Sequence, residues 1–322
     1  MSKEFNFEGK TVLVATPDDD SLAGKYILTG TSFTGLGSET VPFAGILKTS
    51  MIGVSVNCSC PLVAYMSSKA TIEQFVLGMS GGNAGIAGTL IFEGEADSTM
   101  LLKGITVTGY LDSNTADGVG GLFGTVINET DYKFTIDAAT VSDSETDNWG
   151  GINMNFIEND GEAAIKGTNV GTFIGKMVGN VTFNVNSDFH ISVPSLYGTE
   201  STGGVVGRME YFQTPAAEFA YDEQLAILTG YTGDASLYPT IHFSEWSEFS
   251  VKNIQGTGYN GGVIGYTDHA NITNDTANSV LEITDAKIEG GKAAGGFIGY
   301  AAYTTIDGTG MEISILTRTA NG

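Results

Sequence analysis

Cysteine, proline, histidine and basic residues are all scarce in this 322-residue sequence. It has 2 Cys, 6 Pro and 3 His, and 14 Lys and Arg stand against 37 Asp and Glu, which gives a formal net charge of −23. Such a charge repels phosphate backbones and anionic membrane surfaces, so nucleic acid is excluded as a partner. The chain also lacks an apolar run of about 18 residues, so we expect no membrane insertion.

The two cysteines lie close together, as Cys58-Ser59-Cys60 in a strand-like stretch. Their side chains should point to the same face of that strand, where they are predicted to be two small buried hydrophobic groups. A strained disulfide between them stays open. None of the histidines is near in sequence, so we expect no metal site there.

Glycine, in contrast, is abundant, with 45 residues, and much of it falls in one recurring pentapeptide. The five copies are Gly-Gly-Leu-Phe-Gly at 120–124, Gly-Thr-Phe-Ile-Gly at 171–175, Gly-Gly-Val-Val-Gly at 203–207, Gly-Gly-Val-Ile-Gly at 261–265 and Gly-Gly-Phe-Ile-Gly at 295–299. An apolar pair between glycines cannot bury itself, so each copy is predicted to stack on the next, as in a solenoid.

The spacing of the copies indicates the size of the repeat. Their first residues lie 51, 32, 58 and 34 positions apart. The short steps indicate one coil of about 30–34 residues, whereas the long steps fit either a coil with an insertion or nearly two coils. A degenerate copy at 150–154 favours two coils for the 51-residue step, and residues 60–65 resemble a glycine-free copy further upstream.

Each repeat contains three short apolar segments separated by residues that favour turns. In the last full repeat these segments are 263–266, 270–273 and 280–288, and the third alternates as a strand with one exposed face does. This pattern predicts an all-β fold, a parallel β-helix with three-strand coils that forms a single domain over residues 1–322. A propeller or a sandwich stays open as an alternative.

The glycine-bracketed copies resemble the GLUG-type repeats of large bacterial surface proteins, over roughly residues 25–317. Thr172 departs from the pattern because it replaces a motif glycine. The resemblance implies a right-handed β-helix in an adhesin-like protein, at the cell surface or outside the cell, and it supplies no catalytic residue. The chain ends just after the strand-like residues 311–317, without a capping segment, so we expect an excerpt of a longer protein whose signal and anchor lie elsewhere.

The stretch 211–250 breaks the repeat and is predicted to be an insertion. Pro215 and Gly230 can bound a short helix near residues 215–229, packed on the wall of the solenoid. Tyr238 and Trp246 belong to an aromatic group in this stretch and are candidate ligand-binding residues. The alternative is that the insertion only covers the wall.

The residue that follows each motif copy should occupy the same place in every coil. These residues are Thr125, Lys176, Arg208, Tyr266 and Tyr300. If this row faces outward, Lys176, Arg208, Tyr266 and Tyr300 are candidate ligand-binding residues, because phenol rings stack on sugars and cations bind carboxylates. Simple coverage of the strand edges is the alternative.

Acidic turns at 18–20, 112–118 and 143–147 match no complete calcium loop, and solvated turns explain them.

Acid pairs such as Asp18 with Asp20, or Glu245 with Glu248, leave a polysaccharide lyase or glycosidase as the enzyme alternative. However, the chain has only two arginines, Arg208 and Arg318, and no hydrolase elbow, zinc-binding helix or phosphate loop. We therefore expect no catalysis, metal or cofactor. The sequence predicts a non-catalytic cell-surface module, either an adhesin-like binding surface or a structural stalk, with glycans or cell-surface proteins as partners.

Overall fold

The computed structural model describes residues 4–6, 31–36, 44–47, 51–52, 54–68, 72–138, 151–185, 189–212, 221–222, 227–228, 235–244, 247–275, 280–307 and 312–317. Side chains are described within residues 55–68, 72–138, 151–185, 189–212, 235–244, 250–275, 287–289 and 291–307.

The strands, in chain order, are β1 (Glu4–Asn6), β2 (Thr31–Leu36), β3 (Ala44–Leu47), β4 (Met51–Ile52), β5 (Val54–Cys58), β6 (Val63–Ser67), β7 (Ile72–Ser80), β8 (Ala87–Ile91), β9 (Ser98–Asp112), β10 (Gly118–Gly120), β11 (Phe123–Asn128), β12 (Phe134–Ala138), β13 (Ile152–Phe156), β14 (Ile165–Gly171), β15 (Ile174–Gly179), β16 (Val181–Val185), β17 (Phe189–Gly203), β18 (Val206–Glu210), β19 (Tyr221–Asp222), β20 (Ile227–Leu228), β21 (Thr240–Phe243), β22 (Ser247–Gly256), β23 (Tyr259–Gly261), β24 (Ile264–Asn274), β25 (Val280–Gly290), β26 (Ala293–Gly295), β27 (Ile298–Asp307) and β28 (Glu312–Thr317). A 3-10 turn, η2 (Ala235–Leu237), is the only helical element among the described residues.

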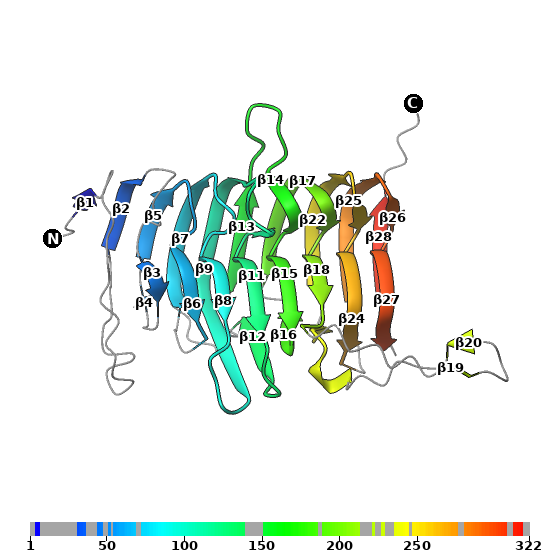
Figure 1. Ribbon diagram of the computed structural model, residues 1–322. Helices are drawn as coiled ribbons and strands as arrows, with labels where there is room; N and C mark the ends of the chain where they lie inside the picture. Colours follow the sequence, from blue (N-terminus) through cyan, green and yellow to red (C-terminus); the bar gives the residue numbers. More distant parts are fainter. Residues whose placement is uncertain are drawn as a thin grey trace.

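The fold is all-β, as the sequence predicts. Twenty-six strands form one sheet, and within the described residues every pairing between its named strands is parallel. Figure 1 shows these strands stacked side by side along one axis, from β1 at one end to β27 and β28 at the other. β-branched residues suit such strands, whereas 45 glycines would weaken helices throughout.

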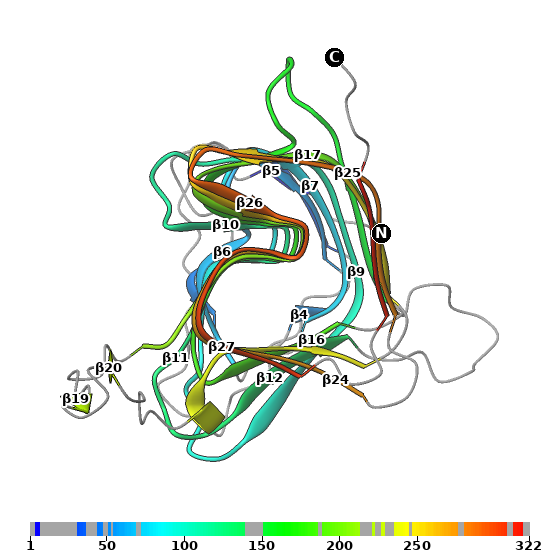
Figure 2. The same cartoon turned by 90° about the vertical axis from the view of Figure 1, so that its right-hand side faces the viewer.

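The strands stack in rows that run along the axis. One row, here called the motif row, contains β6, β8, β11, β15, β18 and the beginnings of β24 and β27. Two other long rows follow. One contains the beginning of β9 with β12, β16 and β21, and the other contains β7, the middle of β9, β13, β17, β22 and β25. In Figure 2, which looks along the axis, the rows surround a common interior.

A fourth row is short and was not predicted. It consists of three-residue segments just before the motif, in β10, β14, β17, β23 and β26. Figure 2 shows β10 and β26 folded inward as a notch between two long rows. The predicted three-strand repeat therefore lacks the fourth strand of each coil. Three residues are too few to show the alternation of apolar and polar residues that identifies a strand in the sequence.

Each step between motif copies is one stacking step, whatever its length. Gly120 pairs directly with Gly171, although 51 positions separate them, and Gly203 pairs with Gly261 across 58. The prediction that 150–154 is a degenerate copy is wrong, because Ile152 begins β13 and pairs with Ile105 in another row. The long steps are therefore single coils with insertions.

Residues 60–65 do lie in the motif row, as predicted, but two coils before the first glycine-bracketed copy. Val63 pairs with Ala87, which in turn pairs with Phe123. The segment Gly85-Ile86-Ala87-Gly88 is the intervening copy that the sequence pattern missed.

The apolar pair of each motif copy packs in or against the interior. Both members are fully buried in the first four copies, as in Leu122 with Phe123 and Val205 with Val206, whereas Phe297 and Ile298 of the last copy are partly buried. Successive residues of a strand point to opposite faces, but here a bend separates the two members, so both point inward. The glycine at the first position of the motif is required for a steric reason. A Cβ on Gly203 would lie 2.0 Å from the carbonyl oxygen of Val206.

The helix predicted near residues 215–229 is not found in the described part of that stretch. There, β19 and β20 form an antiparallel pair, with Tyr221 opposite Leu228, and the other residues of the stretch lie outside the described residues. The stacked rows resume at β21, which pairs with β16 and β24 inside the predicted insertion 211–250.

Candidate functional site

The residues that follow the motif copies do form one continuous row on the surface. Thr125, Lys176, Arg208, Tyr266 and Tyr300 are consecutive partners in the parallel register of β11, β15, β18, β24 and β27. We call these five the post-motif row. Adjacent strands lie about 4.8 Å apart, so each side chain can contact the next. Parallel stacking with one motif per coil is what brings them together.

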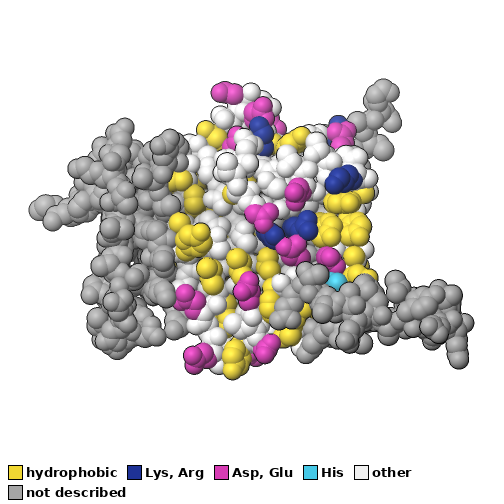
Figure 3. Space-filling model, viewed as in Figure 1, with side chains coloured by type: hydrophobic (Ala, Val, Ile, Leu, Met, Phe, Trp, Pro, Cys, Tyr) yellow, Lys and Arg dark blue, Asp and Glu magenta, His cyan; other side chains and the backbone are white. Residues whose placement is uncertain are grey.

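The basic half of the row is neutralised by carboxylates. Glu210 lies between the two cations: its Oε1 is 2.6 Å from Lys176 Nζ and its Oε2 accepts a 2.7 Å hydrogen bond from Arg208 Nε. Asp117 Oδ2 lies 2.8 Å from Lys176 Nζ on the other side, and Glu200 lies 3.9 Å from Arg208 Nη1. Figure 3 shows basic and acidic side chains gathered near the centre of this face. The cations are thus largely occupied, which disfavours capture of a further carboxylate.

The pKa values reflect this pairing. Burial alone would raise the pKa of Glu210, but hydrogen bonds from Lys176 and Arg208 lower it below its usual range. Burial would likewise lower the pKa of Lys176, and hydrogen bonds to Asp117 and Glu210 raise it instead. Lys176, Arg208 and Glu210 are therefore held in their charged forms.

The aromatic half of the row is a stack that ends in an exposed ring. Arg208 Cζ lies 4.1 Å from the centroid of the Tyr266 ring, and Tyr266 stacks on Tyr300 at 4.8 Å with an interplanar angle of 9°. Tyr259, from the short fourth row, packs against both rings, at 5.5 Å and 5.0 Å. Tyr300 is 40% exposed. Figure 3 shows a band of hydrophobic side chains beside the basic ones.

Sequence reasoning missed two members of this site, Glu210 and Tyr259. Glu210 lies two residues after Arg208 on the same face of β18, which is a signal that strand periodicity could have provided. Tyr259 lies in the short fourth row, which the sequence pattern did not reveal.

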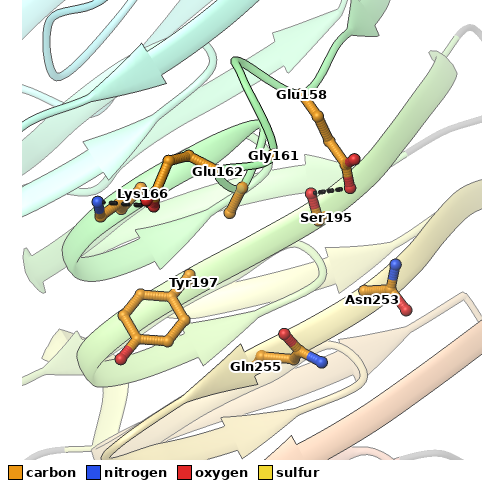
Figure 4. Close-up of a pocket in the computed structure, with 9 residues that line it drawn as sticks. Glu158, Gly161, Glu162, Lys166, Ser195, Tyr197, Asn253 and Gln255 are labelled. Atoms are coloured by element: carbon orange, nitrogen blue, oxygen red, sulfur yellow. Dashed lines mark hydrogen bonds and ion pairs between the residues drawn. The ribbon is translucent and has the colours of Figure 1, made fainter.

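A second feature, a polar pocket, lies on another row and was not predicted at all. It has a volume of about 420 Å³ and is lined by side chains from the loop 158–163 and from β14, β17 and β22. Figure 4 shows Glu158 and Glu162 on the loop side, and Ser195, Tyr197, Asn253 and Gln255 on the strands. The pocket forms because the loop before β14 folds over two neighbouring strands.

The other predicted binding residues lie elsewhere. Tyr238 is only 5% exposed and packs edge-on against Tyr211 and His269, at 5.3 Å and 5.4 Å. Trp246 lies outside the described residues, as do Asp18, Asp20 and Glu245. The side chain of Glu248 is not described either.

Both cysteines are buried, as predicted, and no disulfide joins them. Burial raises the pKa of Cys58 to about 12 and that of Cys60 to about 11, so both are unreactive thiols.

The acidic turn at 112–118 is engaged in contacts within the protein, since Asp117 pairs with Lys176 and accepts a hydrogen bond from Asn169 Nδ2. The turns at 18–20 and 143–147 lie outside the described residues. Among the side chains that are described, no three His, Cys, Asp or Glu groups are placed to hold a metal ion.

In the described part of the chain, no helix has the length and apolar character needed to span a membrane. No family model matches the sequence, and the comparisons found no similar curated protein and no similar solved structure.

Proposed function

We propose that the chain is a right-handed parallel β-helix that serves as a non-catalytic binding module at a cell surface. The register supports the architecture, because the motif glycines at 120, 171, 203, 261 and 295 pair in series through parallel strands. Parallel crossovers are almost always right-handed, which supports the hand. The GLUG-type resemblance of the motif copies supports an adhesin-like, extracellular setting.

The single observation that carries the binding function is the stacked aromatic end of the post-motif row. Three tyrosine rings, from 259, 266 and 300, lie within 5.5 Å of one another. Tyr266 is covered on one side by Arg208 and on the other by Tyr300. The face of Tyr300 turned away from Tyr266 is the remaining platform, and rings of this kind stack well on the apolar face of a sugar. A glycan is therefore the ligand that we propose.

A structural stalk is the second candidate. The contacts along the row support it, because the ion pairs of Glu210 and the stack on Tyr266 join neighbouring coils to each other. Such contacts stabilise the stacking of coils whether or not a ligand binds.

A glycan array distinguishes the two candidates. We expect the purified protein to bind a subset of glycans, and Tyr300→Ala to lose binding to at least one member of that subset. Tyr65→Ala is the matched control, since Tyr65 lies in the same row at β6, is 50% exposed and makes no ring contact among the described residues. Circular dichroism of each variant shows whether it is folded. Absence of glycan binding by the unmutated protein would refute the binding module and leave the stalk.

A further inference from the structure

The polar pocket of Figure 4 is a shaped site that the post-motif row does not include. Its wall is the loop 157–163, which turns sharply at Asp160 and Gly161, both with positive φ, of 49° and 85°. A bridge between Asn159 and Glu162 closes this turn. Its floor is the outer face of β17 and β22, where Tyr197 pairs with Gln255 and Ser195 with Asn253. At about 420 Å³, the pocket is in the size range of small-ligand sites.

Internal bonds fix the wall of the pocket on its floor. Ser195 Oγ donates a 2.8 Å hydrogen bond to Glu158 Oε1 and accepts one of 3.1 Å from the amide of Ala164. Lys166 Nζ pairs with Glu162 Oε2 at 2.9 Å, and this hydrogen bond raises the pKa of Lys166. The loop therefore holds its position over the strands without a ligand, so little ordering is needed on binding.

Several acceptor oxygens of the lining remain available. Asn253 donates one N–H of its amide to Pro194 O, and Gln255 donates one to Glu289 Oε2. In the described part of the chain, no donor reaches Asn253 Oδ1, Gln255 Oε1 or the second oxygen of Glu158. The side chains that carry these acceptors line the space in Figure 4 together with Tyr197. A ligand with several hydroxyl groups and one apolar face matches this lining.

The charges exclude an anionic ligand. Lys166 is the only cation of the lining and is paired with Glu162, while Glu158 is a second carboxylate without a cationic partner among the residues that the structure describes. The whole chain carries a net charge of −23. A uronate or phosphate would thus be repelled both by the carboxylates of the pocket and by the net charge of the whole chain. We propose that this pocket binds a neutral saccharide, with one pyranose ring against Tyr197 and its hydroxyl groups donating to Glu158, Asn253 and Gln255.

This second site does not rest on the function proposed for the post-motif row. The two sites use different strand rows: the pocket lies on β14, β17 and β22, and the post-motif row on β15, β18, β24 and β27. A variant in one site therefore leaves the other in place, and the two proposals can fail separately.

The test is titration calorimetry of the full chain with cellotriose, maltotriose and tri-N-acetylchitotriose as neutral probes, trigalacturonate as an anion and spermidine as a cation. We expect at least one neutral trisaccharide to bind and trigalacturonate not to bind, and any binding of spermidine to the acidic surface to be unchanged by the two pocket variants. Tyr197→Ala and Glu158→Gln should each weaken that binding at least tenfold. The second variant keeps the size of the side chain and the hydrogen bond from Ser195, so it tests the site even where Tyr197→Ala fails to fold.

Tyr65→Ala is the matched control, an exposed tyrosine far along the axis, and it should leave the pocket affinity unchanged. Four results would each overturn the proposal: no binding of any neutral probe, tighter binding of trigalacturonate, spermidine binding that the pocket variants weaken, or binding of the neutral probes that both pocket variants retain. Binding lost in Tyr300→Ala and retained in the pocket variants would refute the pocket alone and support the post-motif row.

Discussion

Phe173 is a core residue whose truncation should strongly destabilise this protein. It is the first apolar residue of the second motif copy and is fully buried. Its ring lies 5.3 Å from that of Phe183 and 4.9 Å from that of Phe189, so one side chain joins two other strand rows of the same coil. Truncation of a buried Phe to Ala costs about 3–5 kcal/mol, and two lost aromatic pairs place Phe173→Ala near the upper end of that range.

Urea unfolding followed by far-ultraviolet circular dichroism measures this cost, as the change in midpoint multiplied by the m-value. Phe173→Leu keeps most of the apolar volume and should lose less than about 1.5 kcal/mol. Tyr132→Ala, at a residue 44% exposed, should change the free energy of unfolding by less than about 0.5 kcal/mol. A loss below about 1 kcal/mol for Phe173→Ala, with an unchanged m-value, would show that the three rings do not form the core described here.

Two further predictions concern buried polar groups. Thr172 Oγ1 is buried without a hydrogen-bond partner in the described part of the chain, so Thr172→Val should raise the free energy of unfolding by about 1 kcal/mol in urea titrations. Thr202, equally buried, donates a 2.9 Å hydrogen bond to Gln255 O, so Thr202→Val should lower it by about 1 kcal/mol; equal signs for the two variants would contradict this reasoning. The pKa of Glu210 is lower in the folded protein than its ordinary value of 4.5, so its stabilising effect is complete above that value and is lost as the pH falls through the folded pKa. The difference in unfolding free energy between the unmutated protein and Glu210→Gln should therefore shrink as the pH falls below 4.5, and a constant difference would rule out the ion pairs as its source.

The all-β class and the common row of Lys176, Arg208, Tyr266 and Tyr300 could both be predicted from the sequence. Both follow from local patterns that repeat. Glycine and β-branched residues exclude long helices, and one motif per coil places each following residue at the same point of the parallel register. The burial of both apolar motif residues follows in the same way.

Other features were decided only by the tertiary structure. Whether a step of 51 or 58 residues is one coil or two depends on which strands pair. Gly120 pairs with Gly171 in spite of the inserted residues between them. The neutralisation of Lys176 depends on Asp117, 59 positions away. The pocket likewise needs a loop and two strands that meet only after the coils have stacked. Contacts between residues so far apart in sequence have no local pattern, so the stacking of the coils decides them.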